Sequence, residues 1–176
     1  ALLLLDRRSP TTDLAASAAL LVCVASTSVG IAFVIGVAVE LIAVRHWRRL
    51  WIVGVPLASY LIWYATLSDS NTKTSSLSVT LRFAQELLAQ TIGTLLGVQA
   101  RGVAADATLF VVVVGLGFAW LRLGKPHSAR LLGIAATLVT MVGALAVGRA
   151  SSGLTSWFSY AVGAVLIILV IELFSH

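Results

Sequence analysis

The longest apolar stretch of the chain runs for 31 residues, from Leu14 to Val44, and contains one charged side chain, Glu40. As one helix it would extend about 46 Å at about 1.5 Å per residue, whereas the hydrocarbon core of a bilayer is about 30 Å thick. The polar triplet Ser26-Thr27-Ser28, followed by Gly30, interrupts the stretch near its middle. The pattern therefore predicts a broken helical hairpin, with helices near residues 14–26 and 30–44.

Further apolar segments, separated by polar or basic residues, follow the hairpin along the rest of the chain. The helices predicted from them lie near residues 50–67, 81–98, 103–121, 131–148 and 159–174. Most of these segments have about the length of one bilayer crossing. We therefore expect an all-α fold, a polytopic transmembrane helix bundle with a broken helical hairpin and an outer interfacial helix, formed as one domain by residues 1–176.

Composition agrees with a membrane protein. Hydrophobic residues make up 59% of the chain and charged residues 11%, whereas soluble domains carry about 25% charged residues. The net charge of +5 would suggest nucleic acid as the partner of a soluble protein. Here the basic residues form short clusters between apolar segments, so we expect a lipid bilayer and no nucleic acid. The single cysteine, Cys23, excludes an internal disulfide and a cysteine-based metal site.

Three basic clusters predict the orientation, because positively charged loops stay in the cytoplasm. The clusters are Arg7 and Arg8; Arg45, Arg48 and Arg49; and Arg122, Lys125 and Arg130. Placing all three in the cytoplasm requires residues 14–44 to cross an even number of times, as a hairpin with its tip at Ser26-Thr27-Ser28. Each leg has about 15 residues, so the legs are short crossings or the hairpin is re-entrant. Residues 50–67 then run outward and residues 103–121 run inward.

This arrangement leaves no single crossing for residues 81–98. Polar residues interrupt that segment, while an apolar stripe follows one side of it. The stripe consists of Phe83, Leu87, Leu88, Leu95 and Leu96. We predict an interfacial helix at the outer face of the membrane. The alternative is a transmembrane helix whose polar residues face the bundle.

The order of these elements resembles the C-terminal half of actinobacterial membrane proteins of the GT-C glycosyltransferase type. The matching stretches are Ser28–Leu41 (SVGIAFVIGVAVEL), Trp47–Leu57 (WRRLWIVGVPL), Tyr60–Tyr64 (YLIWY), and the pair Gly148-Arg149 followed by Tyr160–Ala164 (YAVGA). The closing segment of the family usually has an Arg-Tyr pair before its last helix. Residues 156–160 of this chain, SWFSY, lack that arginine.

The resemblance implies a transferase of the bacterial cell envelope. Such enzymes move a sugar from a polyprenyl-phosphate carrier lipid to an acceptor outside the cytoplasmic membrane, and their catalytic acid lies in the first external loop. We therefore expect a multi-pass protein of the bacterial cytoplasmic membrane that lacks this loop, contains no catalytic residue and needs no cofactor. Its apolar start followed by polar residues 6–10 predicts the end of a helix. We expect a fragment that pairs with missing N-terminal helices and is inactive alone.

Three arginines are the candidate ligands of the carrier phosphate, namely Arg149, Arg82 and Arg101, which all fall at the predicted outer face. A guanidinium can hold a phosphate through paired hydrogen bonds. The alternative for each is a side chain that reaches lipid headgroups or caps a helix. No His, Cys, Asp or Glu residues have metal-ligand spacing, so no metal site is predicted.

Two other classes of function stay open. A transporter would use paired broken helices, and a polar site near Ser26–Ser28 together with Glu40 would favour it. A non-catalytic multi-pass membrane subunit would function through packing against partners. An outward-facing hydrophilic cavity lined by Arg149 and Arg82 would instead favour the transferase.

Overall fold

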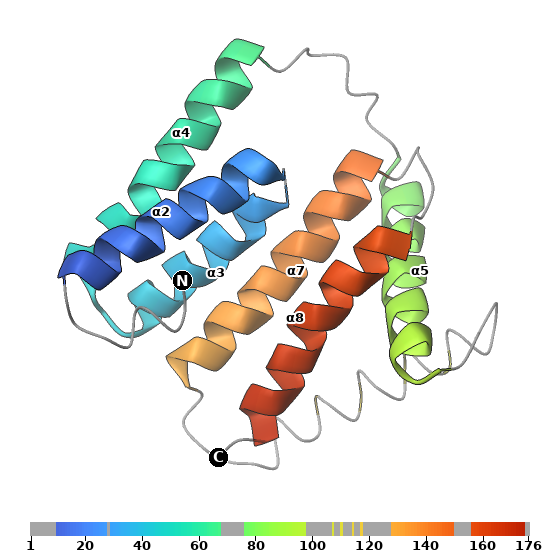
Figure 1. Ribbon diagram of the computed structural model, residues 1–176. Coiled ribbons are helices and arrows are strands. Elements are labelled where there is room, and N and C mark those ends of the chain that lie inside the picture. Colours follow the sequence, from blue (N-terminus) through green and yellow to red (C-terminus); the bar gives the residue numbers. More distant parts are fainter. Residues whose placement is uncertain are drawn as a thin grey trace. The chain divides into compact units, whose positions relative to one another are not determined.

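The computed structural model describes residues 10–27, 29–67, 76–97, 128–149 and 156–174, together with positions 107, 110, 114 and 117. Within these residues every regular element is a helix, which confirms the all-α class (Figure 1). The elements are α2 (Pro10–Ser26), α3 (Gly30–Ala43), the 3-10 helix η1 (Trp47–Arg49), α4 (Trp51–Leu67), α5 (Leu77–Leu95), α7 (Ala129–Arg149) and α8 (Ser156–Phe174). Apart from four isolated helical positions, the predicted helix at 103–121 lies outside the described residues.

The described helices group into two compact units. Unit 1 contains α2, α3, η1, α4 and the first part of α7, up to Met141. Unit 2 contains α5, the rest of α7 from Val142, and α8. The prediction of a single bundle stays a prediction.

Helices α2 and α3 form a hairpin, with α2 ending at Ser26 and α3 beginning at Gly30, where the sequence predicts the break. The amide of Thr27 donates to the carbonyl of Cys23 (3.2 Å), and the amide of Gly30 donates to the carbonyl of Thr27 (2.9 Å). A Cβ atom at Gly30 would lie against the carbonyl oxygen of Cys23 and 2.7 Å from Cα of Val24. Glycine is therefore required at this position because the two helices approach each other at the backbone.

Several helices begin earlier than the apolar pattern predicts. Helix α2 begins at Pro10, four residues before Leu14, because proline fits the first helical position and Asp13 suits the positive end of the helix dipole. Helix α5 runs from Leu77 to Leu95 in place of 81–98, since Gly97 at φ +69° ends it in the left-handed conformation. Ser128 caps α7 by accepting a hydrogen bond from the amide of Leu131 at 3.1 Å.

The core of unit 1 lies between α2, α3 and α4. The buried apolar residues there are Ala16 and Leu20 of α2, Val34, Val37 and Leu41 of α3, and Ile52 and Val53 of α4. Pro56, also on α4, is fully buried. Beyond Pro56 the large apolar side chains of α4 are exposed, and its second half extends past α2 and α3 (Figure 1). Only the first half of α4 is therefore packed within unit 1.

Helix α3 also packs against the beginning of α7 through two glycines. A Cβ atom at Gly36 would collide with the hydroxyl of Thr137 and lie 2.7 Å from the carbonyl oxygen of Gly133. A Cβ atom at Gly133 would lie 2.9 Å from the carbonyl oxygen of Gly36 and 3.0 Å from Cβ of Glu40. Gly36 thus faces both Thr137 and Gly133 of α7, whereas Glu40, one turn later on α3, faces Gly133. The two helices are therefore antiparallel. Small residues allow this approach, as they do between membrane helices.

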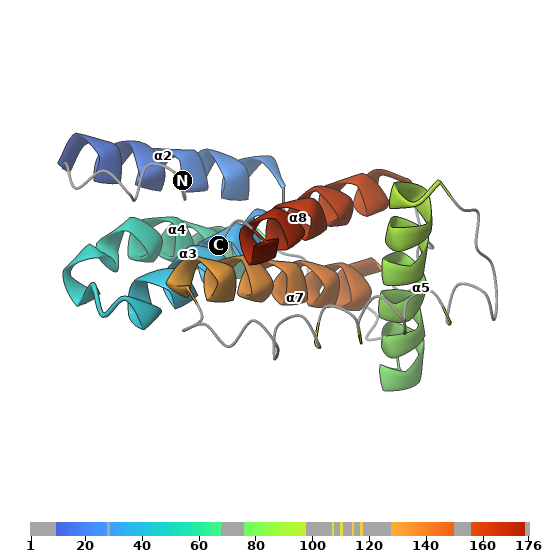
Figure 2. The same cartoon turned by 90° about the horizontal axis from the view of Figure 1, so that it is seen from below.

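In unit 2, helix α5 packs across α8 at a steep angle (Figures 1 and 2). At this contact Gly163 of α8 faces Thr91 and Leu95 of α5. A Cβ atom at Gly163 would lie 3.5 Å from a side-chain atom of Thr91 and 3.6 Å from one of Leu95. Phe83 and Leu87, both predicted for the apolar stripe, are buried, whereas Leu95 and Leu96 are largely exposed. Thr91, one turn after Leu87, is buried on the same side, whereas the buried Ile92 lies on the opposite side of α5 from Phe83. The second half of α5 is therefore buried on more than one side.

Several serine and threonine hydroxyl groups within the described helices donate to a carbonyl one turn earlier in the same helix. Examples are Ser59 to Val55 (3.0 Å), Thr91 to Leu87 (2.7 Å) and Thr137 to Gly133 (2.9 Å). Such bonds satisfy the hydroxyl without water, whether the side chain faces protein or lipid. The hydroxyl of Ser159, in contrast, is buried and has no hydrogen-bond partner among the described residues.

By length and composition, one described helix could cross a membrane. It comprises the 20 residues Ala129–Gly148 of α7. The stretches Pro10–Ser26, Gly30–Ala43 and Phe158–Phe174 are apolar but shorter. This supports association with a membrane.

We expect the same substitution to have opposite effects at two glycines of unit 1. Gly36→Ala should lower the free energy of unfolding by about 1–3 kcal/mol, because the added methyl group overlaps the backbone of α7. Gly54→Ala should raise it by about 0.5–1 kcal/mol, because Gly54 has no atom within 4 Å of its Cβ position and alanine favours the helix. Thermal unfolding followed by circular dichroism in one detergent measures both. Equal midpoints would contradict the packing of α3 against α7.

Candidate functional site

An ion pair joins the beginning of α2 to the turn before α4. Nε of Arg49 lies 3.3 Å from Oδ2 of Asp13, and the two side chains are 18% and 11% exposed. The other carboxylate oxygen of Asp13 is buried and has no hydrogen-bond partner among the described residues. Because a partly buried charge that loses its partner is costly, this contact holds η1 against α2.

The turn between α3 and η1 has an unusual backbone. The amide of Arg45 donates to the carbonyl of Ile42 (3.0 Å), and the amide of His46 donates to the carbonyl of Leu41 (2.9 Å). These are the two hydrogen bonds of the Schellman motif, in which the residue at the position of Arg45 is usually glycine. Arg45 has φ +57°, a left-handed conformation that costs a residue with a Cβ atom about 1–2 kcal/mol.

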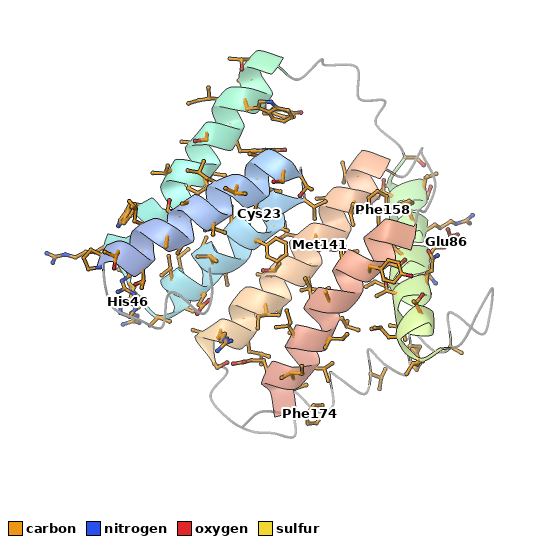
Figure 3. The ribbon with its side chains drawn as sticks, in the orientation of Figure 1. Cys23, His46, Glu86, Met141, Phe158 and Phe174 are labelled. Atoms are coloured by element: carbon orange, nitrogen blue, oxygen red, sulfur yellow. The ribbon has the colours of Figure 1, made fainter. Side chains whose placement is uncertain are left out.

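Basic and aromatic side chains are exposed around this turn. Arg45 and Arg48 are both exposed. Trp47 is 62% exposed and Trp51 is 43% exposed. We refer to Arg45, Trp47, Arg48 and Trp51 as the basic corner. His46, labelled in Figure 3, lies within the same turn and is half-buried.

The described members of two predicted basic clusters lie at one end of unit 1. Because α3 and α7 are antiparallel, Arg130 in the first turn of α7 lies at the end of unit 1 where α3 ends. Asp13, at the start of α2, lies at this end as well, through its ion pair with Arg49. The hairpin tip at Thr27 lies at the opposite end, one helix length away.

The three arginines predicted as phosphate ligands are described to different extents. Arg82 is exposed on α5, opposite the buried side chains of Phe83 and Leu87. Arg149 is the last residue of α7, and its side chain lies outside the described residues, as does all of Arg101. Their common site therefore stays a prediction.

The carboxylates are spread over separate helices. Glu86 is exposed on α5 and points away from α8 (Figure 3). Glu40 is half-buried on α3, with its Cβ against Gly133. Glu172 is half-buried near the end of α8. Among the described residues, no group of three or more His, Cys, Asp or Glu side chains could hold a metal ion.

The polar residues that would favour a transporter lie apart in unit 1. Ser26 is at the hairpin tip and donates to the carbonyl of Val22 at 2.6 Å. Glu40 lies ten residues after Gly30, which places it about 15 Å farther along α3. Ser28 lies outside the described residues. The described part of this set does not form one site.

Comparisons with protein-family models, with curated proteins and with solved structures find no match to this chain. The resemblance to GT-C proteins therefore stays a prediction from the sequence.

The sequence interpretation overlooked the role of Asp13. Its position inside the first turn of a helix, together with an arginine cluster after the returning helix, is the pattern that could have indicated the ion pair. Counting only apolar residues placed Asp13 before the helix and therefore outside the packed structure.

A double-mutant cycle measures the ion pair. Asp13→Asn and Arg49→Gln should each lower the free energy of unfolding by about 2 kcal/mol, because each leaves its partner partly buried without an opposite charge. The double variant should be less destabilised than the sum, with a coupling of about 1 kcal/mol or more. Chemical unfolding in detergent provides the values. Strict additivity would show that the two side chains do not interact.

Proposed function

We propose that this chain is the membrane-embedded part of a GT-C-type glycosyltransferase that uses a polyprenyl-phosphate-linked sugar donor. In this proposal α2, α3, α4, α7 and α8 cross the cytoplasmic membrane and α5 lies at its outer surface. The observation that carries the proposal is the position of α5, which packs across α8 with Phe83 and Leu87 buried and Arg82 exposed.

The surface of α4 supports a membrane environment. Leu61 is 56% exposed and Ile62 is 65% exposed, and the tryptophan and tyrosine that follow them are about half exposed. Soluble monomers rarely expose contiguous apolar surface of this extent. Such a surface is stable where lipid or a partner helix covers it.

Aromatic residues lie at the beginning of α4 and near its other end. Trp51 begins the helix, and Tyr60 lies with its ring centroid 5.9 Å from that of Trp63 and 6.2 Å from that of Tyr64. The two aromatic groups are separated by about 18 Å along the helix axis, less than the hydrocarbon thickness of about 30 Å. Tryptophan and tyrosine are enriched at the interfaces of a membrane. These residues therefore favour a membrane environment for α4, with one of the two groups at an interface.

The crossing of α5 over α8 supports the interfacial role of α5. If α8 spans the bilayer, a helix that crosses it steeply lies closer to the membrane plane than to the membrane normal (Figure 2). In the first half of α5, Phe83 and Leu87 are buried, whereas Arg82 and Glu86 are exposed. A division of this kind is typical of a helix at the boundary between lipid and water.

Arg82 lies in the second turn of α5 and is exposed. Its guanidinium could donate two parallel hydrogen bonds to the phosphate of a carrier lipid whose chain lies in the bilayer beside α8. Glu86 follows one turn later on the same side, so its carboxylate competes with a phosphate for the guanidinium of Arg82.

A non-catalytic membrane subunit is the second candidate. The exposed second half of α4, from Leu57 onward, could equally contact a partner helix, and this observation favours a packing role. Binding of the carrier lipid distinguishes the two candidates.

Arg82→Gln should weaken the binding of undecaprenyl phosphate to the purified chain in nanodiscs by about tenfold or more, since a hydrogen bond to a charged group contributes about 1.5–3 kcal/mol. Arg82→Lys should lose part of the affinity, because lysine lacks the paired donors. Gln90→Ala, on the same exposed side of α5, should bind as the unchanged chain does. Competition between labelled and unlabelled lipid gives the affinities. Equal affinities of all four proteins would contradict the role of Arg82.

A further inference from the structure

We propose that the basic corner is a binding site for the phosphodiester headgroup of an anionic phospholipid. The site would lie at the end of unit 1 opposite the hairpin tip. It rests on the membrane embedding proposed above and does not depend on the carrier-lipid function proposed for α5.

The charge of the corner is the first argument. Arg49 is paired with Asp13, whereas Arg45 and Arg48 form no ion pair with any described residue. Two exposed guanidinium groups separated by three positions in the chain therefore carry unbalanced positive charge. Each arginine near an anionic membrane surface contributes about a fivefold increase in affinity, which corresponds to about 1 kcal/mol.

The backbone at Arg45 is the second argument. Gly97 has the left-handed conformation after α5, and Arg45 has it after α3. Glycine would be more stable than arginine in the turn after α3. A residue held in an unfavourable conformation is a reason to suspect a function for its side chain. Here the side chain that replaces glycine is a cation.

The neighbouring tryptophans are the third argument. Trp47 lies between Arg45 and Arg48, and Trp51 begins the following helix; both are exposed. Indole rings are most stable at the level of the lipid headgroups, where one edge meets water and the ring meets acyl chains. These rings would hold the two guanidinium groups at the depth of the phosphates.

The ion pair between Asp13 and Arg49 completes the site. Arg49 ends η1, so its bond to Asp13 fixes the short helix that carries Trp47 and Arg48. The corner is therefore ordered before lipid binds, which reduces the conformational entropy lost on binding.

The test compares the retention of phosphatidylglycerol and phosphatidylcholine by the purified full chain, measured by native mass spectrometry from mixed micelles. The unchanged chain should retain phosphatidylglycerol preferentially, and increasing salt should reduce the preference. In the double variant Arg45→Gly and Arg48→Gln, the preference for phosphatidylglycerol over phosphatidylcholine should be about 30-fold weaker than in the unchanged chain. Its unfolding midpoint should not decrease, because glycine suits the turn after α3.

A matched double variant, Arg45→Lys and Arg48→Lys, keeps both charges and should keep most of the preference. The proposal is overturned if the Gly/Gln variant retains phosphatidylglycerol as the unchanged chain does. It is also overturned if the Lys/Lys variant loses as much as the Gly/Gln variant, or if inorganic phosphate displaces the lipid more strongly than chloride does at equal ionic strength. Should the Gly/Gln variant fail to fold, Arg48→Gln alone applies the same criterion with an expected loss of about fivefold.

Discussion

The ion pair between Asp13 and Arg49 connects three helices of unit 1 at one end. It attaches the start of α2 to the short helix that joins α3 to α4, so the hairpin and α4 converge there. The apolar core lies just beyond it, where Ala16, Val37 and Ile52 are buried against one another. At this end Asp13 is paired with Arg49, and the side chains of Arg45 and Arg48 are exposed.

The same end contains the feature with the clearest functional implication. A glycine would satisfy the backbone after α3, yet Arg45 occupies the position, beside Trp47 and Arg48. In the topology that the basic clusters predict, the basic corner would meet an anionic headgroup at the inner surface of the membrane. In the same proposed topology, Arg82 on α5 would meet a carrier phosphate at the outer surface.

The sequence predicts the helices well where apolar length decides the outcome. The break near Ser26–Ser28 follows from a stretch too long for one crossing, and Gly30 is required there because α2 and α3 approach closely. Helix starts are predicted less well, because Asp13 is polar and still belongs to α2. The contact of Gly36 on α3 with Gly133 on α7 could not be predicted from the sequence. Local periodicity identifies the apolar side of a helix, but it does not identify the distant helix that packs against that side. For the site, the apolar period of α5 is enough to place Arg82 on the exposed side of its helix. The left-handed backbone of Arg45 contradicts the local preference of arginine, so only the structure reveals it.

The central claim is that the basic corner and the hairpin tip lie on opposite sides of a membrane. In a Cys23→Ser background, single cysteines at Thr27 and Arg48 can be labelled with a membrane-impermeant maleimide in intact bacteria. Thr27→Cys should react in intact cells, whereas Arg48→Cys should react only after the membrane is permeabilised. Labelling of both cysteines in intact cells, or of neither until permeabilisation, would contradict the claim.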